Sequence, residues 1–305
     1  MDTIQEKLLE EIADLHGVPE GAYNIRANGG LAGRKTTAHI DIVTKTDKPG
    51  IDIRIKPGTK NESVHIPVIL SQTGYQELVY NDFYIGEDSD VTIIAGCGIH
   101  NGGGEEARHD GVHQFFVGKN ARLRYVEKHY GQGDGNGERV MNPTTLIHME
   151  ENSYMLMEST QIKGIDSTRR VTRGDLKAGA RLDIRENIMT HGKQFASTEF
   201  EVELNGENCG ADVVSHSVAR DESRQDFYSV MNGNAACKGH SECDAIVMDR
   251  ATVKASPALA ANNVDASLIH EAAIGKIAGE QLIKLMTLGL TEAEAEEKII
   301  SGFLK

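Results

Sequence analysis

Tryptophan is absent from the sequence of 305 residues, and only 7 Phe and 8 Tyr accompany 32 Gly. Few aromatic side chains and many glycines predict tight turns around a core of small residues. The same scarcity argues against an enzyme that acts on polysaccharides, because such an enzyme needs a substrate groove lined with aromatic side chains.

Long apolar runs are also absent, since none approaches the roughly 20 consecutive apolar residues that span a bilayer. The acidic start MDTIQEKLLEEIADL lacks the basic and apolar regions of a secretory signal. Four cysteines, Cys97, Cys209, Cys237 and Cys243, are too few and too scattered for a secreted disulfide framework. We therefore expect a cytoplasmic protein with free thiols and no membrane partner.

Basic residues are outnumbered, because 32 Lys and Arg against 46 Asp and Glu leave a formal net charge of −14. This charge repels phosphate backbones, so nucleic acid is not expected as a partner. No stretch fits the phosphate loop G-x-x-x-x-G-K-[ST], and we expect no nucleotide on this chain.

Residues 1–20 predict a short amphipathic helix. Thr3 and Glu6 have the spacing of a capping box, and Gly17 can end the helix in a left-handed cap. The apolar stripe consists of Ile4, Leu8, Leu9, Ile12 and Leu15.

Residues 21–267 change to short stretches in which apolar and polar residues alternate, as in IDIRIKPG and FEVELNG. A polar turn followed by a small residue and a strand recurs about every 30 residues, in the range of stacking repeats. The expected strand starts are near Val91, Ala121, Ser153, Ala180 and Ala211. No helical stretch intervenes, so an all-β core folded as a parallel β-helix is favoured. A β-sandwich remains the alternative.

Residues 268–305 return to a helical period and predict a helical hairpin. Its first helix stops at Gly289, and its second opens with a capping box from Thr291 to Glu294. Such a hairpin can cap the open end of the β-stack, or its outer face can dock another protein.

The segment CGIHNGGGEEARHDGVHQFF concentrates residue types that bind transition metals. A mononuclear metal enzyme that uses His100, His109 and His113 is therefore one hypothesis. The two later histidines also fit a surface position beside the glycine loop.

Two later segments carry further ligand types. ACKGHSECDAIVMD contains Cys237, His240 and Cys243, although buried cysteines are more often packing residues than reactive ones. ASLIHEAAIGKI places His270 and Glu271 where the last strand is expected to give way to helix. Adjacent residues point in different directions, so one copy cannot easily aim both at one metal, whereas two copies can.

The block GHSECDAIVMD, followed by DASLIHEAAIGKIAGEQLIKLMTLGLTEAEAEEKIISGFLK, resembles the core of the SufB/SufD proteins of the SUF iron–sulfur assembly system. The likeness extends through HDGVHQFFVGKNARLRYVEKHYG, STRRVTRGDLKAGARL and VELNGENC, and so from about residue 35 to the end. It is greatest to short, SufB-like members found without a separate SufD.

The resemblance implies a right-handed parallel β-helix whose C-terminal helices bind SufC, an ABC-type ATPase, in a complex of two such subunits and two SufC. It implies a non-catalytic scaffold for a transient iron–sulfur cluster, with a sulfur donor and apo-protein acceptors as further partners. The cluster ligands carried over are Cys243, Glu271 and His270, with Cys237 and His240 as weaker candidates. Because this chain holds all three main ligands, we predict a homodimer bridged by its late strands.

One departure concerns sulfur. SufB has a further cysteine inside its β-helix that is thought to accept sulfur, and the nearest register here, TTLIHMEENSY, offers His148. Cys237 is a possible substitute, and a buried packing role fits it equally well. A carbohydrate-active β-helix enzyme and the mononuclear metal enzyme remain the rival hypotheses.

Overall fold

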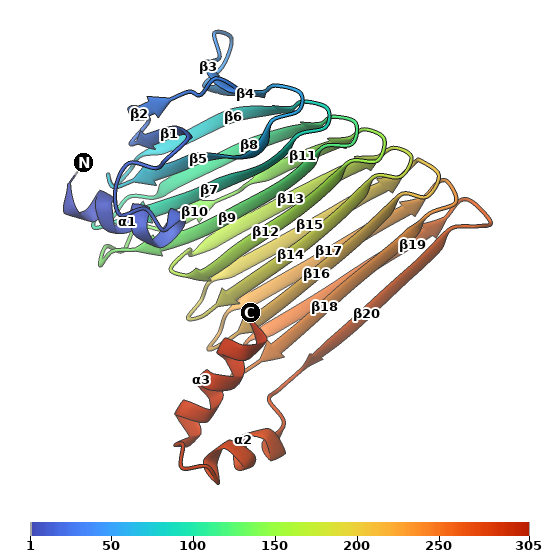
Figure 1. Cartoon of the computed structure of the whole chain (residues 1–305). Helices are drawn as coiled ribbons and strands as arrows, with labels where there is room; N and C mark the ends of the chain where they lie inside the picture. The colour runs from blue at the N-terminus through green and yellow to red at the C-terminus, as the bar shows by residue number, and fades with distance from the viewer. Residues whose placement is uncertain (1, 305) are drawn as a thin grey trace.

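The computed structural model describes residues 2–304 and shows a chain wound into a parallel β-solenoid (Figure 1). Beyond the N-terminal hairpins, each turn contributes to two sheets of ten strands, which enclose a large apolar cluster and a smaller one. The first sheet has the order β2 (Gly30–Lys35), β1 (Ala22–Ala27), β5 (Lys60–Leu70), β7 (Asp90–His100), β9 (Arg122–Gln132), β12 (Tyr154–Lys163), β14 (Arg181–Thr190), β16 (Gly210–Ala219), β18 (Lys238–Val247), β20 (Ser267–Gly275). The second has the order β19 (Thr252–Ala261), β17 (Arg224–Gly233), β15 (Phe195–Leu204), β13 (Ser167–Leu176), β10 (Arg139–Met141), β8 (Ala107–Val117), β6 (Gln76–Ile85), β4 (Gly50–Ile55), β3 (Ile40–Thr44), with β11 (Thr144–Met149) between β8 and β13.

Parallel pairing between consecutive turns sets the repeat that the sequence shows. Val91, Leu123, Met155, Leu182 and Ala211 occupy one buried row across five neighbouring strands of the first sheet. Each of these side chains points inward because it occupies an alternate position of its strand. The predicted β-helix is confirmed, and the parallel register excludes the β-sandwich.

The polar turns before the strands of the first sheet have a common backbone shape. Asp88, Asn120, Asn152, Gly179 and Asn208 each have φ between 55° and 67°. This left-handed region is easily reached only by glycine and, to a lesser degree, by Asn and Asp. The turn chemistry therefore explains why these positions recur in the sequence.

The N-terminal end of the solenoid is covered by α1 (Thr3–Ala13), which packs on the outer face of the first sheet. The helix is confirmed, but its caps differ from the prediction. Asp2 and Gln5 form the capping box, and Asp14 adopts the left-handed C-cap. Gly96 and Gly98 of β7 leave room for the helix, since a Cβ on Gly96 would lie 2.7 Å from the Ile12 carbonyl oxygen.

The C-terminal end differs from the prediction at residues 268–275. These residues belong to β20, so the helical part begins at α2 (Gly279–Met286) and continues in α3 (Glu292–Phe303). Tertiary pairing with β18 overrides the helix-compatible composition of this segment. The capping box from Thr291 to Glu294 is confirmed. Over residues 2–304, no helix is both long and apolar enough to cross a bilayer.

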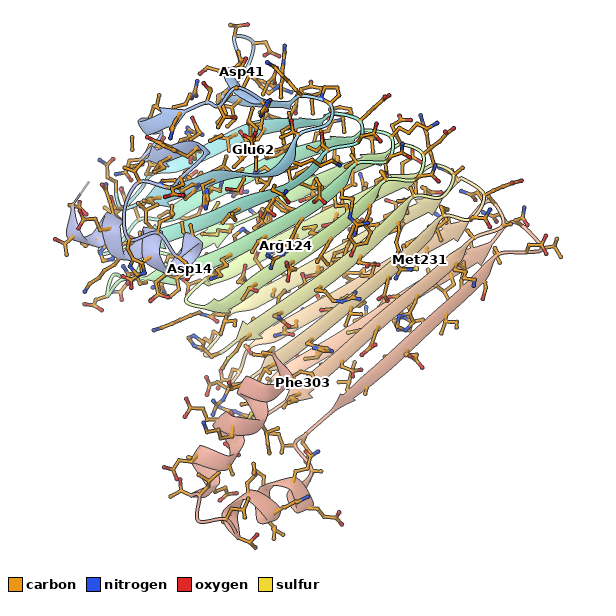
Figure 2. All side chains as sticks on the ribbon, in the orientation of Figure 1. Asp14, Asp41, Glu62, Arg124, Met231 and Phe303 are labelled. Carbon is orange, nitrogen blue, oxygen red and sulfur yellow. The ribbon has the colours of Figure 1, made fainter. Side chains whose placement is uncertain are left out.

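Beyond the end of β20 the chain forms α2 away from the sheet, and α3 then runs back so that its C-terminal end lies at the first sheet (Figure 1). Figure 2 shows Phe303, near the end of α3, against that sheet, where its ring stacks on His216 of β16 with 5.0 Å between centroids.

Candidate functional site

Cys243 lies in the middle of β18 and is only 1% exposed. Its side chain faces the solenoid interior, between Ser215 of β16 and Ala272 of β20 in the register of the sheet. Because β20 is the last strand of the first sheet, a single strand separates this thiol from the end of the stack.

A cavity of about 20 Å³ adjoins Cys243, enough space for about one water molecule. Glu186 and Ser215 line it, and the Ser215 hydroxyl donates to Glu186 Oε2 at 2.8 Å. Burial raises the pKa of the Cys243 thiol to about 12, and the nearby carboxyl groups of Glu186 and Asp244 add to the effect. Cys243 is therefore a neutral thiol at neutral pH, and a metal ion bound there would have to displace its proton.

His270 and Glu271 lie within β20, not at a junction of strand and helix as the sequence predicts. Their side chains point to opposite faces, as adjacent residues of a strand must. His270 pairs with Ser241 on the inward face, and among residues 2–304 neither ring nitrogen has a hydrogen-bond partner. Glu271 faces outward, where its Oε2 lies 3.2 Å from His240 Nε2.

The predicted ligands are thus divided between the two faces of one sheet. Cys243 and His270 point inward, one strand apart, whereas Glu271 and His240 meet on the outside. Over residues 2–304, neither Cys243 nor His270 joins a trio of ligand atoms within reach of one ion. A single copy does not assemble the predicted site.

Cys237 lies six residues before Cys243, about 20 Å away along an extended strand. It is buried at the turn before β18, where a cavity is lined by both Cys237 and Cys209. This position separates it from Cys243.

The histidines of the rival metal-enzyme hypothesis do not gather. His109 and His113 are buried, so the surface position considered for them is wrong. His109, Gly111 and His113 occupy alternate, inward-facing positions of β8, and Gly111 leaves space between the two rings. Together with His100 they form no trio of ligand atoms close enough for one ion within the described chain. His148 lies exposed on β11, stacked on Phe116.

Cys97 belongs to a buried polar cluster in the N-terminal half. Its partners are His109 and His129, and His109 Nδ1 lies 2.9 Å from Glu77 Oε1. Burial raises the pKa of the Cys97 thiol, but the positive charge of His109 outweighs this and lowers it to about 7. Cys97 thus has far more thiolate character than Cys243.

The interior also holds charges that the sequence analysis missed. Arg170 is 1% exposed; its Nη1 lies 2.7 Å from Glu127 Oε2 and its Nε 3.3 Å from Glu186 Oε1. Glu127 and Glu186 share the inward row of Cys243 on the first sheet. Strict alternation after Leu123 is the sequence signal that would have placed Glu127 inside.

The fold and these side chains define a parallel β-solenoid whose late strands carry thiol, imidazole and carboxylate groups, the ligand types of transition metals. The family described as SUF system FeS cluster assembly, SufBD core domain, matches residues 76–303, and the chain belongs to this family.

Curated relatives agree with this membership. An iron–sulfur cluster assembly SufBD family protein of Methanocaldococcus jannaschii is 29% identical over 255 residues, which cover 83% of this chain and 79% of the relative. A SufBD family protein of Pyrococcus horikoshii is 30% identical over 285 residues, which cover 86% of this chain and 84% of the relative. A SufBD family protein of Archaeoglobus fulgidus is 28% identical over 263 residues, which cover 85% of this chain and 69% of the relative.

Proposed function

We propose that this chain is a non-catalytic scaffold on which an iron–sulfur cluster is assembled and then handed to apo-proteins. The cluster is cargo, held for a time by Cys243, His270 and Glu271. Membership of the SufBD family supports the class of function. The observation that carries the proposal is Cys243, an inward-facing thiol one strand from the open end of the stack.

The ligand chemistry suits transfer. Thiolates hold iron–sulfur clusters strongly, whereas imidazole and carboxylate ligands bind iron more weakly. The high pKa of Cys243 makes the neutral thiol the resting form, so release of the cluster is favoured by reprotonation.

We propose that the working unit is a homodimer joined through the late strands. Exposed apolar side chains cluster on the last strand of each sheet: Leu259 on β19, Ile269 and Ile274 on β20. A second copy paired there would cover these side chains and the free strand edges.

We propose that the C-terminal helices dock a SufC-type ABC ATPase. This chain has no phosphate loop of its own, so the partner would carry out the ATP hydrolysis. Helix α2 has no buried residue. Ile283 within it and Leu288 just after it are among the most exposed large apolar side chains of the described chain. An apolar helix face left open in this way fits a partner protein better than a simple cap.

Anaerobic reconstitution with iron and sulfide tests the cluster site. The wild-type chain is expected to gain charge-transfer absorbance toward the blue end of the visible spectrum, and Cys243→Ser to lose it. Cys209→Ser is the matched control, because Cys209 is an equally buried thiol of the same core. Undiminished absorbance in Cys243→Ser would show that the site is assigned wrongly.

Co-purification tests the docking segment. A chain ending at residue 279 is expected to fold but no longer to retain the ATPase subunit. An intact complex with the shortened chain would place the docking surface on the solenoid.

A further inference from the structure

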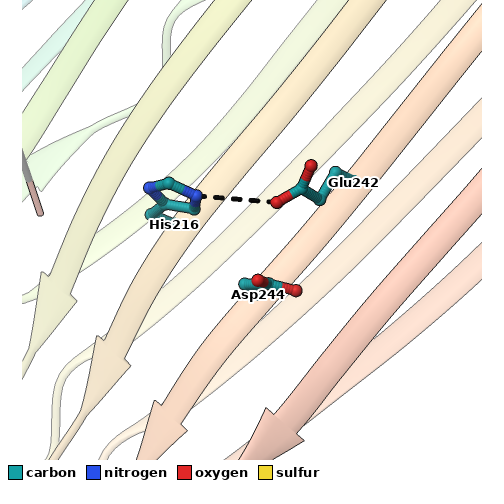
Figure 3. Close-up of side chains that lie close together, drawn as sticks. All are labelled: His216, Glu242 and Asp244. Carbon is teal, nitrogen blue, oxygen red and sulfur yellow. Dashed lines mark ion pairs between the residues drawn. The ribbon is translucent and has the colours of Figure 1, made fainter. Parts of the chain in front are cut away.

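The outer face of the first sheet carries a group of ligands behind Cys243. His216 of β16 lies directly opposite Asp244 of β18, and Glu242 precedes Asp244 on the same face. One ligand atom from each of the three lies within 4.8 Å of the other two. Figure 3 shows the three side chains close together on the neighbouring strands.

The spacing fits a shared ion better than direct pairing. His216 Nε2 and Glu242 Oε1 are 3.7 Å apart, too far for a hydrogen bond. Two ligands bound to one ion at about 2.1 Å are separated by about 3.4 Å in tetrahedral geometry. A small movement of either side chain would therefore allow both to hold one ion.

We propose that His216, Glu242 and Asp244 form a binding site for a divalent first-row transition-metal ion. One imidazole and two carboxylates suit such ions and leave coordination positions for water. The site can be reached from solvent, since the side chains of His216 and Glu242 are 29% and 27% exposed. Asp244 Oδ1 accepts from the Ala273 N–H at 3.0 Å, which fixes the carboxylate in place.

A neighbouring group supports the assignment. Glu242 also forms a trio with His240 and Glu271. His240 Nδ1 lies 2.7 Å from Asp212 Oδ1, so its Nε2 is directed toward Glu242 and Glu271. Carboxylates commonly orient metal-binding histidines in this way. Glu242, which belongs to both groups, is the residue on which binding depends most.

The biological ion rests on the proposed function: if the chain assembles iron–sulfur clusters, the ion is iron(II). Cys243 lies between Glu242 and Asp244 on the same strand but points to the opposite face. The outer site would hold iron next to the cluster thiol without using that thiol as a ligand.

Metal titration of the full-length chain, without sulfide, tests the site. Cobalt(II) is the optical probe, and anaerobic iron(II) the second probe. We expect binding that Glu242→Gln weakens roughly 10-fold or more and His216→Gln weakens less. His39→Gln is the matched control, since the His39 and Glu62 pair on the surface has no third ligand in the described part of the chain. Metal binding by this variant should equal that of the wild type.

Three outcomes would overturn the site. They are no metal binding by the wild type, metal binding by both the Glu242 and His216 variants as tight as that of the wild type, or weakening by His39→Gln as large as that by Glu242→Gln. Circular dichroism checks folding, and if Glu242→Gln does not fold, the more exposed His216→Gln decides. Cys243→Ser should retain metal binding. Metal binding without reconstitution would therefore reject the proposed function alone, and Cys243-dependent reconstitution without metal binding would reject this site alone.

Discussion

The two ends of the solenoid are built differently. At the N-terminal end, α1 covers the outside of the sheet, and the antiparallel strands β2 and β3 complete the two sheets. At the C-terminal end, β19 and β20 remain parallel, and their inward-facing residues reach the surface. Both ends leave edge strands, but the first ends in antiparallel pairs, whereas at the second the parallel stack simply stops and its inward face is exposed to a partner.

The interior also differs along the solenoid. In its middle, buried charges are neutralised by one another, as with Arg170 between Glu127 and Glu186. At the C-terminal end, both ring nitrogens of His270 lack partners among residues 2–304, and apolar side chains of the last strands are exposed. An unpaired imidazole beside exposed apolar groups at the end of the stack is where assembly is expected.

The largest expected effect comes from the buried charges in the middle of the solenoid. Arg170→Met should lower the free energy of unfolding by about 3–5 kcal/mol, because it leaves two buried carboxylates without their cation. The control Arg173→Met removes the exposed pair with Glu201 and should cost at most about 1 kcal/mol. Urea unfolding measures both, and equal losses would show that the interior charges are not coupled as described.

His113 should make the stability of the fold sensitive to acid. Burial lowers its pKa to about 4 from an ordinary value of 6.5. The neutral ring therefore stabilises the fold above pH 6.5, and this contribution, up to about 3 kcal/mol, is lost as the pH falls to 4.

Unfolding free energies measured across this pH range should fall less steeply in His113→Gln than in the wild type. His148→Gln, on the exposed face, should follow the wild type. A wild-type slope in His113→Gln would mean that other groups carry the acid sensitivity.

The open end should respond in association, not in stability. Ile274→Lys, at a side chain 44% exposed, should weaken the proposed dimer on the order of 10-fold with little change in monomer unfolding. Leu31→Lys on β2, 59% exposed at the other end, should leave association unchanged. Sedimentation equilibrium measures dimerisation of both variants. A dimer weakened only by Leu31→Lys would mean that the N-terminal end forms the interface.

The smallest expected effect concerns α3. Phe303→Ala removes the stacking on His216, worth about 1 kcal/mol, and should raise amide exchange in α3 about 5-fold without changing global unfolding. Leu288→Ala, at a side chain 76% exposed, should not change exchange in α3. Unaltered exchange in Phe303→Ala would mean that other contacts hold the helix.

Much of the fold could be predicted because its signals are local. Alternation of polar and apolar residues marks the strands, and the Asn, Asp and Gly turns mark the repeat. The segment from Ser267 to Gly275 could not be assigned this way, because only its pairing with β18 makes it a strand. Cys243, His270 and Glu271 were selected by family resemblance, and alternation alone could not tell which faces they occupy.

The sequence by itself determined the all-β repeat of about 30 residues and the family resemblance, since turn chemistry, residue period and motif blocks are properties of neighbouring residues. Tertiary structure alone decided that Glu127, Glu186 and Cys243 share one buried row, and that Glu271 faces away from Cys243. The reason is register: residues about 30 positions apart become neighbours only when the turns stack, and one residue of shift would exchange the inside and the outside.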